Sequence, residues 1–141
     1  MNPVLAAARR YLDLGWSIIP VTPAVPGDPL RDGKHPDLES WLPYTRRQPL
    51  PEEIEYWFAG PAERNLGVVC GAVSHNLLVI DCGDMDTARA LVFQMRVLGK
   101  TMTVKTSKGI HLYTYTDQTV ATTTFRRNGL THHVKSDGQQ V

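Results

Sequence analysis

The apolar positions of the chain follow two spacings, and each spacing predicts its own kind of element. From position 3 to position 14 they recur every three or four residues, which predicts an amphipathic helix that Gly15 ends. The same spacing predicts helices over 49–58 and 84–98, and Gly99 ends the second of them. Short apolar or alternating runs predict strands. These runs cover 16–21, 65–71, 77–81, 101–105, 110–115 and 131–135.

The order of these elements predicts an α+β fold. The helices are too few to cover every pair of strands, so we expect a mixed or antiparallel central sheet with flanking helices. The connection over 72–76 has the length of a hairpin, which predicts that 65–71 and 77–81 are antiparallel neighbours. The proline-rich stretch 22–37 and the polar stretch 119–124 are predicted to be loops.

The strand over 77–81 carries a carboxylate, Asp81, to its C-terminal end. A buried strand that ends on an acid is a common way to build a metal or catalytic site, and the alternative is that Asp81 only caps the next helix. Asp84 is placed to cap that helix as well. Side chains alternate between the two faces of a strand, so His111 shares a face with Tyr113, and His133 shares one with Lys135.

Composition and charge restrict the classes of function. The 141 residues suffice for a single domain over 1–141. With 15 Lys and Arg against 14 Asp and Glu, the net charge of +1 excludes a global basic field, and a site for a polyanion must be local. Cys70 and Cys82 lack metal-type spacing and are expected to be buried free thiols. Without a signal-like or membrane-length apolar run, we expect a cytoplasmic protein with no membrane partner.

Acid, histidine and cations together indicate a nucleotidyl-transfer site. Carboxylates bind divalent cations through oxygen, as Asp81 would. The Ser-Lys-Gly turn before His111 offers backbone amides to a triphosphate. Positively charged side chains near these elements in the sequence suit the binding of a triphosphate. They are Lys105, Lys108, Arg126 and Lys135.

The order and spacing of several runs resemble one family. Asn65 to Gly71, then Leu78 to Asp81, then Thr103 to Tyr113 are similar to the bifunctional DNA primase/polymerase N-terminal domain, a branch of the archaeo-eukaryotic primase superfamily. The resemblance extends over essentially the whole chain. It also includes Gly15 to Pro20, Lys34 to Pro36, Phe125 to Gly129 and Val134 to Gly138.

The resemblance implies roles for individual residues. Asp81 would hold Mg²⁺ or Mn²⁺, and His111 would contact the phosphates of an incoming nucleoside triphosphate. A DNA template or primer would be the other partner. The further nucleotide-binding positions are Lys105, Ser107, Lys108, Gly109 and Lys135. The nucleic-acid-binding positions are Lys34, Arg126 and Arg127.

The sequence departs from the family pattern at two acids. The second acid of the first motif falls at Gly83, and the acid of the third motif falls at His133. Asp84 is the expected substitute for the first, provided that the strand end is bulged. His133 would ligate a softer ion such as Mn²⁺ or Zn²⁺ without bringing negative charge.

The leading hypothesis is a metal-dependent nucleotidyltransferase, the primase and polymerase domain of a plasmid or phage replication protein. The resemblance implies that the domain continues past Val141, often ahead of a helicase region, so that a primase-like fold would be incomplete at its C-terminus. One alternative is a degenerate, non-catalytic nucleotide- or DNA-binding module. Another is a metal-dependent nuclease that uses Asp81, His111 and His133, although no motif favours it. His132 and His133 are equally consistent with plain surface residues.

Overall fold

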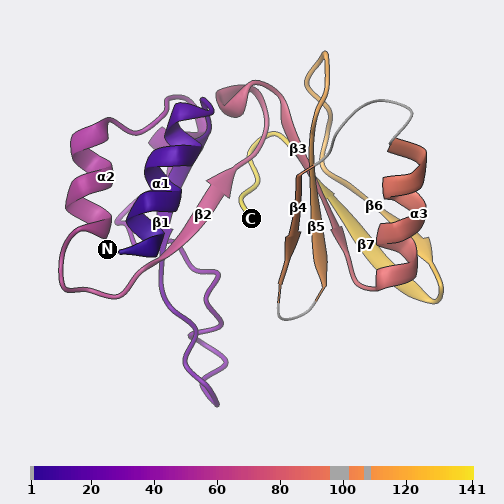
Figure 1. Ribbon diagram of the computed structural model, residues 1–141, viewed down its shortest axis with the longest axis horizontal. Coiled ribbons are helices and arrows are strands. Elements are labelled where there is room, and N and C mark those ends of the chain that lie inside the picture. The colour runs from indigo at the N-terminus through magenta and orange to yellow at the C-terminus, as the bar shows by residue number, and fades with distance from the viewer. Residues whose placement is uncertain (1, 96–101, 107–108) are drawn as a thin grey trace.

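The computed structural model describes residues 2–95, 102–106 and 109–141, and within them it has three α-helices and seven strands (Figure 1). The helices are α1 (Pro3–Asp13), α2 (Pro51–Phe58) and α3 (Met85–Met95), with short 3₁₀ turns η1 (Leu42–Thr45) and η2 (Ala72–Ser74). The strands are β1 (Ser17–Val21), β2 (Asn65–Val69), β3 (Leu77–Cys82), β4 (Met102–Lys105), β5 (Ile110–Tyr115), β6 (Thr123–Arg127) and β7 (Leu130–Lys135). No helix among these residues is both long enough and apolar enough to span a bilayer.

All strand pairs are antiparallel, and they form two separate sheets. The small sheet has the order β1-β2, and the large sheet has the order β4-β5-β3-β7-β6. Figure 1 shows α1 and α2 beside the small sheet and α3 against the large one. The predicted α+β class with antiparallel pairing and flanking helices is therefore confirmed.

Local sequence explains how α1 begins and where it packs. The side chain of Asn2 accepts hydrogen bonds from the backbone N–H groups of Val4 and Leu5, which would otherwise lack partners at the helix N-terminus. The amide of Asn2 donates to the carbonyl of Phe58 over 2.6 Å. One side chain thus caps α1 and joins it to the end of α2.

The predicted hairpin between 65–71 and 77–81 is wrong. β2 pairs with β1, and β3 pairs with β5 and β7, so only the isolated bridge Gly71–Leu77 links the two segments. Between them η2 is followed by two left-handed residues, His75 (φ 59°) and Asn76 (φ 60°). These backbone angles turn the chain out of the small sheet and into the large one.

A second difference concerns the stretch 119–124. It was expected to be a loop, but β6 begins at Thr123 and extends through both arginines as an edge strand of the large sheet. Only Phe125 on this strand is half-buried, so the sequence shows no apolar alternation there. The predicted end of a helix at Leu98 and the start of a strand at Thr101 lie outside the described residues.

The large sheet is covered on both faces. The larger apolar core lies between one face of this sheet, the small sheet and α1 and α2, and the smaller core lies between the other face and α3. Cys70 belongs to the first core and Cys82 to the second, and both are buried free thiols as predicted. Burial raises the pKa of Cys70 to about 12 and that of Cys82 to about 11.

The segment after β7 returns to the small sheet and links the two halves. The N–H of Val68 donates to the carbonyl of Val141 over 2.6 Å, and the N–H of Cys70 donates to the carbonyl of Gln139 over 2.8 Å. Figure 1 shows this C-terminal segment between the two sheets. It therefore forms part of the wall of the space between them.

Candidate functional site

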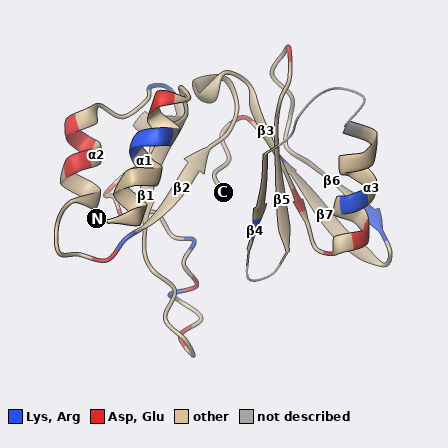
Figure 2. Ribbon diagram, in the orientation of Figure 1, with Lys and Arg blue, Asp and Glu red and all other residues tan. Residues whose placement is uncertain are grey.

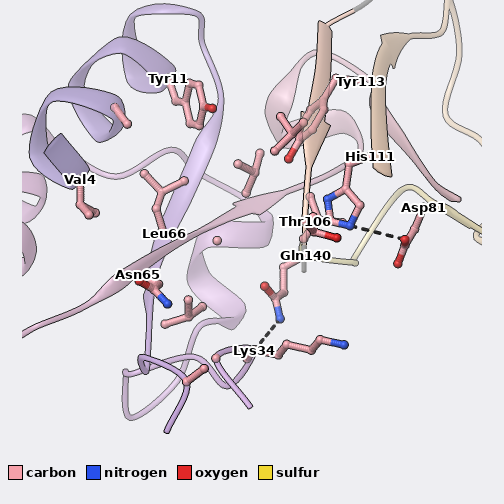
Figure 3. A pocket seen from close by; sticks show the side chains of 18 of the residues that line it. Val4, Tyr11, Lys34, Asn65, Leu66, Asp81, Thr106, His111, Tyr113 and Gln140 are labelled. Carbon is pink, nitrogen blue, oxygen red and sulfur yellow. Dashed lines mark hydrogen bonds and ion pairs between the residues drawn. The ribbon is translucent and has the colours of Figure 1, made fainter. Parts of the chain in front are cut away.

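A cavity of about 740 Å³ lies between the two sheets (Figure 3). The large sheet and the turn after β4 contribute Asp81, Val104, Thr106, His111, Tyr113 and Lys135 to its lining. The other wall comes from α1, β2, the loop after β1 and the C-terminal segment, through residues that include Val4, Tyr11, Lys34, Leu66 and Gln140. The volume suits a small-molecule ligand the size of a nucleotide.

Strand pairing places one histidine on each side of Asp81. In the register of β5, β3 and β7, Asp81 is opposite His111 on one side and opposite His133 on the other. The Nε2 atom of His111 lies 3.5 Å from Oδ1 of Asp81 (Figure 3). The acid and the histidine predicted from separate motifs are therefore in direct contact. We call His111, Asp81 and His133 the cross-strand row.

The cross-strand row keeps Asp81 ionised. The pKa of its carboxyl is lowered, first because the His111 imidazole donates toward it and then because positive charge on His111, Lys135 and His133 favours the carboxylate. Partial burial opposes this effect without cancelling it. Asp81 therefore brings a negative charge to the cavity that Lys34 and Lys135 also line.

Lysines reach this end of the cavity from both walls. Lys135 pairs with Val79, two positions from His133 on the same face of the sheet, which confirms the predicted alternation. Lys34 comes from the loop after β1, and its carbonyl accepts a 2.9 Å hydrogen bond from the Gln140 amide (Figure 3). Lys34 lines the same cavity as His111, and its predicted contact with nucleic acid stays a prediction.

The turn between β4 and β5 is closed by Thr106 and Gly109. The N–H of Gly109 donates to Oγ1 of Thr106 over 3.0 Å, and the N–H of Thr106 donates to the carbonyl of Gly109 over 2.9 Å. Gly109 also lies so close to the Cys82 carbonyl that a Cβ atom would overlap that oxygen. Packing against this carbonyl therefore explains why position 109 is a glycine. The other two residues of this turn, Ser107 and Lys108, lie outside the described residues.

Lys105 lies at the rim of the cavity at the end of β4. It pairs with Ile110, whereas Val104 pairs with His111. By alternation its side chain belongs to the face opposite that of His111. Its predicted role in nucleotide binding stays a prediction.

Asp84 is engaged at the N-terminus of α3. Its Oδ1 accepts the Thr87 N–H over 2.7 Å, and its Oδ2 accepts the Thr87 hydroxyl over 3.0 Å. His132 lies 3.6 Å from the same carboxylate. Asp84 does not line the cavity, and its carboxylate faces Thr87 and His132. Its predicted metal role stays untested.

Gly83 has room for a side chain, but on the side of His132. A Cβ atom there would meet Leu130 at 3.5 Å and His132 at 4.0 Å, which are ordinary contacts. His132 is fully buried and accepts the Gly83 N–H at Nδ1 over 3.0 Å. Its Nε2 then carries the hydrogen and lies 3.1 Å from the carbonyl of Arg127. His132 is therefore a structural residue rather than a surface one.

The two neighbouring arginines of β6 lie on opposite faces. Arg126 pairs with Thr131, on the face of His133, and its guanidinium donates to the Thr131 hydroxyl and the Gly129 carbonyl. Arg127 pairs with Leu130, and its guanidinium donates to the Thr87 hydroxyl on the α3 side. Only Arg126 shares a face with the cross-strand row.

Charge around the site is local, as the composition indicated. Figure 2 shows acidic residues on α2 and both signs on α1 and α3. Within the described residues no group of three or more His, Cys, Asp or Glu side chains is arranged to hold a metal ion. The cross-strand row supplies one carboxylate and two imidazoles, which does not fit the clustered carboxylates of a site for two Mg²⁺ ions.

Some cavity residues were not predicted from the sequence. Tyr11, Leu66 and Gln140 line the cavity from three separate segments, and they carry no motif or spacing that points to one another. The signal for Tyr113 was present, because alternation placed it on the face of His111.

Comparison with known proteins identifies the family. The family model described as bifunctional DNA primase/polymerase, N-terminal, matches residues 8–141. Neither the curated proteins nor the solved structures contain a significant match to the chain. Because the family model extends over nearly the whole sequence, the chain belongs to the bifunctional DNA primase/polymerase N-terminal family.

Proposed function

We propose that this domain binds nucleoside triphosphates in the cavity between its sheets and joins them on a DNA template, as a nucleotidyltransferase. The observation that carries the proposal is the direct contact between Asp81 and His111 on a cavity that lysines approach from both walls. Family membership supports the same class of reaction. The partners would be a DNA template or primer and nucleoside triphosphates.

Several groups of the chain would hold and orient the triphosphate. Lys34 and Lys135 provide positive charge, and the Thr106 hydroxyl provides a neutral contact on the same lining. The contact with Asp81 orients the imidazole of His111, which would hydrogen-bond a phosphate oxygen. Positioning and electrostatic stabilisation account for most of the catalysis of phosphoryl transfer, so these contacts are the ones that matter.

The donors near Asp81 do not match the Mg²⁺ or Mn²⁺ site that the resemblance implies. The cross-strand row has a single carboxylate, and Asp84 is engaged with Thr87. Asp81 and His133 are the donors that a divalent ion would meet first.

A primer-synthesis and primer-extension assay in Mg²⁺ and in Mn²⁺ tests the proposal. We expect incorporation by the wild-type chain and its loss, by about 100-fold or more, in Asp81→Asn and His111→Ala, because each removes a positioned charge. Asp117→Asn is the matched control, since Asp117 is an exposed acid on a loop. Wild-type protein that is inactive in both ions would reject the enzymatic proposal.

The second candidate function is a non-catalytic nucleotide- or DNA-binding module. It is favoured by the replacement of two expected acids by Gly83 and His133. Calorimetric titration with ATP in EDTA separates the two functions. Tight binding without metal and without turnover supports the binding module, and turnover that depends on Asp81 supports the enzyme.

A further inference from the structure

The ring of Tyr113 is held rigidly on the wall of the cavity. It stacks on the Trp16 ring with 5.4 Å between centroids and 12° between planes. The indole N–H of Trp16 donates to the hydroxyl of Tyr115 over 2.6 Å, which fixes the indole in turn. Tyr113 is only 7% exposed, so the surrounding core restricts its ring to one position.

Trp16 and Tyr115 bond each other, and the Tyr113 hydroxyl bonds none of the described residues. No side-chain oxygen of the described residues is both fully buried and unpaired, so this hydroxyl is accessible from the cavity. Figure 3 shows this hydroxyl directed into the cavity. Burial raises the pKa of Tyr113, so the group stays protonated and can both donate and accept. Because it is not sealed inside the core, this hydroxyl is available to hydrogen-bond a ligand in the cavity.

The position of Tyr113 matches the sugar of a bound nucleotide. It lies two residues after His111 on the same strand face, which is about 7 Å along a strand. Figure 3 places Tyr113 and Tyr11 at one end of the cavity and Lys34, Thr106 and Asp81 nearer the other. The walls around the tyrosines are apolar, through Val4 and Leu66. Phosphates at the charged end would put the sugar next to Tyr113.

We propose that the Tyr113 hydroxyl hydrogen-bonds the 2′-hydroxyl of a nucleoside triphosphate, so that the domain selects ribonucleotides over deoxyribonucleotides. This inference rests on the proposed function, because it assumes that the cavity holds a nucleoside triphosphate. A cavity of about 740 Å³ has room for the extra oxygen, so the selection comes from hydrogen bonding rather than from steric exclusion.

The expected size of the selection follows from one hydrogen bond. One hydrogen bond between two neutral groups, in a site that is otherwise unchanged, corresponds to about a three- to tenfold difference in the dissociation constant. Tyr113→Phe removes the hydroxyl and leaves the stacked ring in place. Since that hydroxyl bonds none of the described residues and the ring stays stacked, we expect the melting temperature of the variant to equal that of the wild type.

Calorimetric titration of the whole chain with ATP and with 2′-deoxyATP, in Mg²⁺ and in EDTA, tests the inference. We expect the wild type to bind ATP about three- to tenfold more tightly than 2′-deoxyATP, and Tyr113→Phe to bind both with the affinity that the wild type has for 2′-deoxyATP. Tyr56→Phe, at an exposed tyrosine of α2, is the matched control and should keep the wild-type ratio.

Four results would overturn the inference. Equal wild-type affinities for ATP and 2′-deoxyATP, or affinities for both nucleotides that Tyr113→Phe leaves unchanged, reject sugar recognition while the proposed function stands. An equal loss of both affinities in Tyr113→Phe assigns Tyr113 a packing role only. Absence of binding of either nucleotide to the wild type rejects the proposed function and the inference with it.

Discussion

His133 lies directly opposite Asp81 across the β3–β7 pair, at the position where the resemblance implied an acid. The same carboxylate faces His111 from the other side at 3.5 Å. The cross-strand row therefore has one carboxylate between two imidazoles, in place of two neighbouring carboxylates. This relationship explains why the pKa of Asp81 is lowered and why no metal-holding cluster of acids and histidines is found within residues 2–95, 102–106 and 109–141.

His133→Asp is expected to create a magnesium-dependent gain in stability. Without divalent ions, two carboxylates directly opposite each other should lower the free energy of unfolding by about 0.2–1 kcal/mol. Mg²⁺ should then raise the melting temperature of the variant more than that of the wild type, because two adjacent carboxylates bind the ion better than one. Thermal unfolding in EDTA and in Mg²⁺ measures both effects.

His133→Asn is the control for that prediction, since it removes the imidazole without adding charge. If Mg²⁺ stabilises the Asp and Asn variants to the same extent, position 133 does not reach an ion held by Asp81. The row would then be a set of neighbours and not a potential metal site.

Gly109→Ala is expected to destabilise the domain by about 1–3 kcal/mol, because its Cβ would overlap the Cys82 carbonyl. Gly83→Ala is the matched control, because a Cβ at position 83 meets its neighbours only at ordinary contact distances. Denaturant unfolding of both variants tests the contrast. Equal stabilities would mean that the backbone contact at Gly109 relaxes without cost.

The sequence predicted the positions of helices and strands better than it predicted which strands pair. The periodicity of apolar residues located all three described helices and six of the seven described strands, because burial acts locally on each element. It missed β6, an edge strand whose residues other than Phe125 are exposed. The hairpin prediction failed because the length of 72–76 does not reveal two left-handed residues, His75 and Asn76.

The same distinction holds for the site. Alternation correctly grouped His111 with Tyr113 and His133 with Lys135, because the period of a strand is local information. That His111 and His133 flank Asp81 depends on the strand order β5-β3-β7, which the pattern does not contain. The burial of His132 depends on hydrogen bonds to the backbone of Gly83 and Arg127, and no spacing in the sequence indicates these bonds.

Glu53 is expected to make the stability of the domain depend on acid pH. Its carboxylate accepts two hydrogen bonds from Arg47 and one each from Tyr44 and the Leu50 N–H. These bonds, with that of Arg47 the largest effect, lower its pKa from 4.5 to about 2. A lowered native pKa means that the stabilisation is complete above the unfolded value. It is lost as the pH falls from about 4.5 to about 2.

Glu53→Gln should therefore lower the free energy of unfolding by about 1–2 kcal/mol near pH 7 and remove part of the acid dependence. Glu52→Gln, an exposed neighbour in the same helical turn, should do neither. Urea unfolding at several pH values between 3 and 7 provides the measurement. Parallel pH profiles for the wild type and Glu53→Gln would contradict the assignment.

The opposite orientations of Arg126 and Arg127 predict different effects on nucleic-acid binding. Arg126 shares the face of His133, so Arg126→Ala should weaken the binding of single-stranded DNA and reduce the slope of log K against log salt by about one. Arg127 bonds Thr87 beside α3, so Arg127→Ala should leave that slope unchanged and lower stability slightly. Fluorescence anisotropy with labelled DNA at several salt concentrations, together with thermal unfolding, separates these effects. If Arg127→Ala changes the slope and Arg126→Ala does not, DNA contacts the α3 side of the sheet and not the face that carries Asp81.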